Sequence, residues 1–78
     1  MPRYFFNIRD GSDLRDEHGV ELSDLKAARE VAVGAASDAI RDLAHSATFW
    51  DTGDWRLDVT DEQDTQVITL RLSGHSQN

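Results

Sequence analysis

The segment between Ser23 and His45 constrains the fold most, because its apolar residues recur at steps of three and four. That spacing is typical of an amphipathic helix with one buried face. About 21 residues in this conformation extend about 30 Å. Ser23 is the predicted N-cap, and Asp24 follows in the first turn, where a carboxylate suits the helix dipole. The predicted buried face comprises Leu25, Ala28, Val31, Ala32, Ala35, Ala36, Ala39, Ile40 and Leu43.

A strand before this helix supplies part of the surface that the helix must cover. Residues 3–9 alternate, which places Tyr4, Phe6 and Ile8 on one face of a predicted strand. Residues 19–22 are predicted to form a short second strand that folds back along the first one. We expect this short strand at an edge of the sheet.

Two further alternating segments follow the helix. Residues 55–59 and 66–72 are joined by a polar turn, which predicts an antiparallel hairpin. The fold class is therefore predicted as α+β, with a small, mostly antiparallel sheet of three to four strands and one long helix on one face. The whole is one domain over residues 1–72, and residues 73–78 form a polar tail that we expect to be disordered.

The net charge of −7 is concentrated in two segments. Residues 10–24 carry six acids against Arg15 alone, and residues 51–64 carry six against Arg56 alone, so each segment has a charge of −5. Acidic segments of this kind repel a phosphate backbone, so no nucleic-acid partner is expected. The N-terminus lacks the pattern of a secretory signal, and no apolar run is long enough for a membrane span. We expect a cytoplasmic protein that does not bind membranes.

The acidic loop is the first candidate for a metal site, because Asp10, Asp13, Asp16 and Glu17 lie close together in the sequence. Their spacing does not match a calcium-binding loop, and the chain has no cysteine to offer a thiolate ligand. No metal and no cofactor are therefore predicted. No nucleophile motif or glycine-rich phosphate loop occurs either, so we expect no catalytic residues and no enzymatic activity.

Large aromatic residues after the helix give the most informative candidate for an interaction surface. Alternation assigns Trp55 to the core, whereas Phe49 and Trp50 are adjacent in a predicted loop. Phe49 is expected to close the core, which leaves Trp50 at the surface beside Asp51 and Asp54. An aromatic centre with a polar rim is typical of interface hot spots. The predicted interaction surface therefore consists of Phe49, Trp50, Asp51 and Asp54.

Residues 2–11, 19–29 and 55–72 together carry a family resemblance. The chain resembles a family of short, uncharacterised bacterial proteins, chiefly alphaproteobacterial, that is classed as a domain of unknown function. The resemblance implies the same fold boundaries and a bacterial cytoplasm, and it implies no activity. This chain differs where such proteins often carry His at the position of Asn7 and Gly near Asp64 or Thr65. The matching features are Tyr4, Phe6, Asp10 and Gly11, then residues 19–25, then Val59, Thr60, Asp61 and Glu62.

The leading functional hypothesis is a small protein-interaction or regulatory module, which binds a protein partner or associates with itself. The alternative is an acidic decoy or inhibitor that presents carboxylates to a basic protein surface. A metal-binding or enzymatic protein is the less favoured third class. The decoy would use a face formed by Asp51, Asp54, Asp58, Asp61, Glu62 and Asp64.

Overall fold

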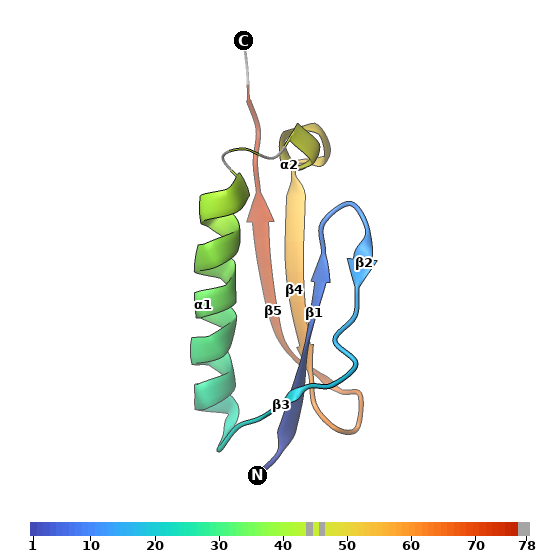
Figure 1. Cartoon of the computed structure of the whole chain (residues 1–78), viewed down its shortest axis with the longest axis vertical. Helices are drawn as coiled ribbons and strands as arrows, with labels where there is room; N and C mark the ends of the chain where they lie inside the picture. The colour runs from blue at the N-terminus through green and yellow to red at the C-terminus, as the bar shows by residue number, and fades with distance from the viewer. Residues whose placement is uncertain (44, 46, 77–78) are drawn as a thin grey trace.

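The computed structural model describes residues 1–43, 45 and 47–76. Within these described residues, five strands and two helices succeed one another (Figure 1). They are β1 (Arg3–Arg9), β2 (Asp13–Leu14), β3 (Val20–Glu21), α1 (Leu25–Leu43), α2 (Ala47–Thr52), β4 (Asp54–Thr60) and β5 (Gln66–Ser73).

The five strands form one antiparallel sheet in the order β2-β1-β4-β5, and β3 also pairs with β1. Strand β1 lies beside the β4/β5 hairpin, and the two short strands pair with its other edge, β3 near its start and β2 near its end. The sheet with one long helix confirms the predicted α+β class. The short strand expected at residues 19–22 is β3, whereas β2 was not predicted.

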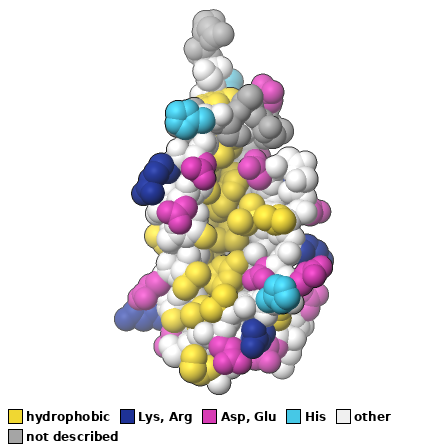
Figure 2. Space-filling view, in the orientation of Figure 1, with side chains coloured by type: hydrophobic (Ala, Val, Ile, Leu, Met, Phe, Trp, Pro, Cys, Tyr) yellow, Lys and Arg dark blue, Asp and Glu magenta, His cyan; other side chains and the backbone are white. Residues whose placement is uncertain are grey.

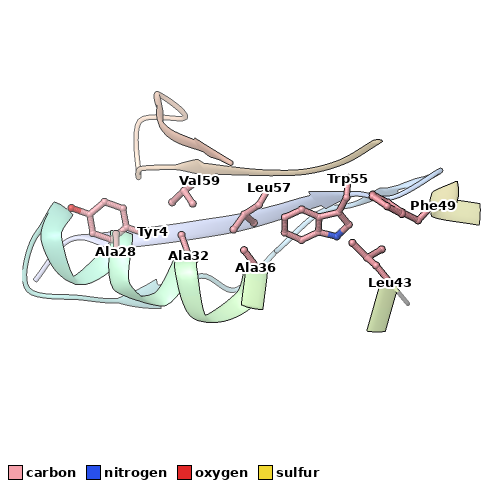
Figure 3. Packing of buried hydrophobic residues seen from close by; sticks show 9 residues of the cluster. All are labelled: Tyr4, Ala28, Ala32, Ala36, Leu43, Phe49, Trp55, Leu57 and Val59. Carbon is pink, nitrogen blue, oxygen red and sulfur yellow. The ribbon is translucent and has the colours of Figure 1, made fainter. Parts of the chain in front are cut away.

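The core lies between α1 and one face of this sheet (Figure 3). The registers Phe6–Val59 and Ile8–Leu57 bring the inner-face residues of β1 opposite those of β4. Small side chains at every fourth position of α1 let the helix lie close to the sheet, and hydrophobic side chains are seen between α1 and the strands in the space-filling view (Figure 2). The most buried residues are Ala28, Ala32, Leu57 and Val59, each 0% exposed, followed by Trp55 at 3%.

The start of α1 differs by one residue from the prediction. Asp24, and not Ser23, is the N-cap, because its Oδ1 accepts the backbone N–H of Ala27 at 2.9 Å. The helix begins at Leu25, so Ala27 is the third helical residue, which is the position that an N-cap side chain reaches. Either residue type can cap a helix, and the backbone path decides which of them does.

Residues after α1 are more ordered than the sequence indicates. The segment expected to be a loop around Phe49 forms the short helix α2. The predicted disordered tail, residues 73–78, lies partly outside the described residues, since 77 and 78 are not described. Within the described part, Ser73 is the last residue of β5, and the Gly74 N–H donates to the carbonyl of Gly53 at 3.0 Å. The domain therefore extends beyond the predicted boundary at residue 72.

One carboxylate stabilises the turn of the hairpin between β4 and β5. Asp61 Oδ1 accepts the backbone N–H groups of Gln63 and Thr65, each at 2.9 Å. Asp64 has a φ of 61°, the left-handed region that L residues with a side chain rarely adopt. Gly adopts that conformation freely, and the resemblance described above implies Gly near Asp64 or Thr65.

Candidate functional site

Helix α2 lies at one end of the molecule, between the end of α1 and the start of β4 (Figure 1). Its two aromatic residues differ in burial. Phe49 is 5% exposed and belongs to the core, whereas Trp50 is 46% exposed. This burial agrees with the sequence-based expectation that one residue of the pair closes the core and the other faces outward.

The Trp50 side chain is held in place by two neighbours. Its ring packs edge-on against Phe49, with centroids 5.2 Å apart and an interplanar angle of 78°. Gly74 lies against the same rings, because a methyl group placed there would approach Phe49 Cζ to 2.7 Å and Trp50 Cζ3 to 3.2 Å. The chain after β5 therefore packs against the aromatic pair, and the sequence contains no local signal for this contact.

Two exposed carboxylates lie near Trp50 in the sequence and at the same end of the molecule. Asp51 is exposed, and Asp54 has 48% of its side chain exposed. Arg71 approaches Asp54 to 3.9 Å, which is the long limit of an ion pair. We call Trp50, Asp51 and Asp54, together with the buried Phe49 beneath them, the α2 surface.

A row of arginines crosses the outer face of the sheet, the face opposite α1. The strand registers place Arg9 opposite Arg56, and Arg56 opposite Arg71. Like charges in adjacent cross-strand positions repel one another unless carboxylates intervene. Each arginine has such a carboxylate: Asp13 lies 2.6 Å from Arg9, Asp58 lies 2.9 Å from Arg56, and Asp54 lies 3.9 Å from Arg71.

These pairs are structural and mostly exposed. The hydrogen bond and charge of Asp13 raise the pKa of Arg9, and Arg9 in turn lowers the pKa of Asp13. Arg56 Nε is close to Asp58 Oδ2, but its N–H is not aimed at that oxygen in hydrogen-bond geometry, and the nitrogen is buried. The row is therefore balanced by its own carboxylates and presents no large excess of positive charge.

An open hollow of about 300 Å³ lies over this outer face. It is lined mainly by polar and charged residues, which include Asn7, Arg9, Arg15, Arg56, Asp58 and Asp64. Small-molecule sites are usually concave and largely apolar. The hollow contains no histidine, and two of its three arginines are paired with aspartates.

The acidic loop is attached to β1 through the carboxylate of Asp16. Its Oδ1 accepts the N–H groups of His18 and Gly19 at 3.1 and 3.0 Å, and its Oδ2 accepts the N–H of Phe6 at 3.1 Å. Partial burial raises the pKa of Asp16, but the three N–H donors outweigh it, so the pKa lies below its usual value. In addition, Asn7 Oδ1 accepts the N–H of Asp16 at 2.9 Å.

The loop candidate for metal binding is thus tied to backbone amides. Within the described residues, no three His, Cys, Asp or Glu side chains are grouped in a way that could hold a metal ion. Nothing in the local sequence distinguishes Asp16, whose carboxylate reaches β1, from the other three acids of the loop. Asn7 connects this loop to β4, because its Nδ2 donates to the carbonyl of Asp58 at 3.4 Å.

The carboxylates of the hypothetical decoy face are also engaged within the chain. Asp58 pairs with Arg56, Asp61 holds the hairpin turn, and Glu62 accepts the backbone N–H of Arg3 at 3.0 Å. These contacts do not favour a face that offers six free carboxylates to another protein.

Comparison with known proteins gives a family but no activity. Residues 3–73 match the model of a domain of unknown function, DUF6894, and the chain belongs to this family. Neither a curated protein nor a solved structure shows a significant match to the chain. None of the helices in the described part of the chain combines the length and the apolar character that crossing a bilayer requires.

Proposed function

We propose that this member of the DUF6894 family is a small cytoplasmic protein-interaction module and not an enzyme, with the α2 surface as its contact site. The observation that carries the proposal is the placement of Trp50, which is 46% exposed although its ring packs against a buried aromatic residue. Interface hot spots are enriched in Trp and cluster around such anchors.

Preorganisation is the physical advantage of this arrangement. A binding surface loses affinity when flexible side chains must be ordered on contact, at about 0.5–1.5 kcal/mol for each one. Phe49 and Gly74 already restrict the Trp50 ring, so less of this cost remains. The rim formed by Asp51 and Asp54 is polar, as the rims of transient interfaces usually are.

The charge of the surface indicates the chemistry of its partner. Asp51 and Asp54 are acidic, and the whole chain carries −7. A cationic side chain of the partner gains attraction from both carboxylates, and an arginine over the indole face adds a cation–π contact. The proposed partner is therefore a protein that presents a basic segment, and we expect its association rate to fall as salt rises.

Two variants test the proposal. Trp50→Ala removes the anchor. Val20→Ala is the matched control, because Val20 is also exposed, at 43%, and lies in β3 at the end of the sheet remote from α2. Both proteins, and the wild type, are immobilised and exposed to native cytoplasmic extract, and the affinity of each recovered protein is then measured with purified components. We expect partners retained by the wild type and by Val20→Ala to be lost with Trp50→Ala.

A stability measurement accompanies this comparison, because loss of binding has no meaning in an unfolded variant. Trp50→Ala removes an aromatic pair, which contributes about 0.5–1.5 kcal/mol, and circular dichroism is expected to show an intact fold. Equal affinity of a recovered partner for the wild type and for folded Trp50→Ala would exclude the α2 surface as its binding site.

A further inference from the structure

The two edges of the sheet differ in whether other strands pair with them. The edge formed by β1 is closed along its length, because β3 pairs with Arg3 and Tyr4, and β2 pairs with Ile8 and Arg9. Between these short strands, the Asp16 carboxylate accepts the N–H of Phe6. Proteins protect sheet edges in such ways because unpaired backbone groups attract other strands.

The other edge is β5, which is the last strand in the sheet order. It is eight residues long, and within the described residues no strand pairs with its outer side. It contains no Pro and no Lys, the residues that commonly block pairing at an edge. A register shift against β4 interrupts regular pairing near the start of β5, at Gln66 and Val67. The open edge from Ile68 to Ser73 therefore offers a strand for β-augmentation.

Burial along β5 also indicates a missing neighbour. Its inner-face residues Ile68, Leu70 and Leu72 are only partly buried, although they pack against the core. The residues directly opposite them on β4 are 0–3% exposed.

The distribution of charge over the chain favours this edge for contact between two copies. A chain with a net charge of −7 repels its own copy over most of its surface. Strand β5 contains no Asp or Glu, and Arg71 is its single charged residue. Two β5 strands can therefore meet without bringing their own carboxylates together.

We propose that β5 is a self-association surface, on which a second copy of this chain adds its own β5 in antiparallel orientation and joins the two sheets. Residues directly opposite each other in such a pair point to the same face of the sheet. The two-fold axis therefore passes beside Thr69 or Leu70, each facing its own copy. In these two registers Arg71 faces Val67 or Thr69 of the second chain, and never Arg71.

The two copies of α1 are compatible with pairing between the two β5 strands. Helix α1 contacts both β4 and β5, and the two-fold axis places both helices on the same face of the joined sheet. Both helices then lie near the two-fold axis, because the two β5 strands adjoin at about 4.8 Å. The two α2 surfaces then lie at opposite ends of the dimer (Figure 1), since β5 ends beside α2.

Sedimentation equilibrium at concentrations up to the millimolar range tests this proposal on the intact chain. The wild type is expected to approach twice its mass of 8.8 kDa. Thr69→Lys is the principal variant, because Thr69 Oγ1 lies 3.2 Å from Asp58, so an ammonium group is tolerated in the single chain. In the dimer the lysine faces its own copy or Arg71, and we expect the dissociation constant to rise by at least about tenfold.

Ser37→Lys is the matched control, since it adds the same charge at an exposed position of α1 and is expected to leave dimerisation unchanged. Trp50→Ala is expected to dimerise as the wild type does, which separates this proposal from the role of the α2 surface. A wild type that stays monomeric at all concentrations would refute the proposal, as would Thr69→Lys with unchanged dimerisation.

Amide hydrogen exchange of the wild type provides a second test that needs no variant. Protection in β5 is expected to increase with protein concentration, whereas protection in β1 stays constant. Concentration-dependent protection confined to α2 or β1 would place the interface elsewhere and overturn the assignment.

Discussion

Replacement of Asp16 is the sharpest test of how the acidic loop is held. In the wild type, one carboxylate accepts three backbone N–H groups, from Phe6, His18 and Gly19. Asp16→Ala removes both acceptor oxygens and so leaves all three N–H groups without this partner. In Asp16→Asn, the amide oxygen can still serve His18 and Gly19, but the amide NH₂ group then faces the Phe6 N–H, so donor meets donor.

The magnitude follows from the number of bonds and their exposure. Hydrogen bonds to a charged acceptor contribute about 1.5–3 kcal/mol each when they are buried. The loop is only partly buried, so water replaces some of the lost bonds. We therefore expect the free energy of unfolding to fall by about 3 kcal/mol for Asp16→Ala and by about 2 kcal/mol for Asp16→Asn. That is a large fraction of the 5–15 kcal/mol typical of a folded domain.

Urea denaturation at neutral and acidic pH measures both the loss and its origin. The pKa of Asp16 is lowered in the folded chain from its ordinary value of 3.8, because three backbone N–H groups donate to the carboxylate. Its contribution is therefore complete above that value, and it is lost as the pH falls through the lower folded-state pKa. We expect the difference in stability between wild type and Asp16→Asn to narrow below about pH 4. A difference that does not depend on pH, or a loss below about 0.5 kcal/mol at neutral pH, would refute this account.

Two further substitutions test local backbone geometry. Asp64→Val places a β-branched residue at a φ of 61° and is expected to cost about 1–2 kcal/mol in thermal or urea unfolding; a neutral result would mean that the hairpin turn rearranges easily. Gly74→Ala forces a methyl group against Phe49, so we expect a loss of about 1–3 kcal/mol and a change in the fluorescence of Trp50. Unchanged stability and fluorescence would show that the chain after β5 does not pack on the aromatic pair.

Local patterning predicted the fold class and most of the inner face. It was wrong for Val31 and Ile40, which the helical spacing places on the buried side although they are 40% and 54% exposed. A period of two in residues 3–9, 55–59 and 66–72, and steps of three and four in the helix, each report which side of a local element is apolar. For the same reason, Trp55 is found in the core, and the pair Phe49 and Trp50 is divided between core and surface. These features depend on neighbours close in the chain, so local pattern suffices.

Tertiary contacts determine which polar residues stabilise the fold and which edge of the sheet is open. Asp16 and Asp10 look alike in sequence, and Asp16 becomes structural because Phe6 leaves an unpaired N–H on the β1 edge, ten residues away. Gly74 acquires a role only where the chain after β5 meets Phe49. The open edge of β5 follows from strand order, which is fixed by pairing between segments remote in sequence. Hydrogen bonds and packing between distant residues have no local periodicity, and the amino-acid pattern therefore carries no direct record of them.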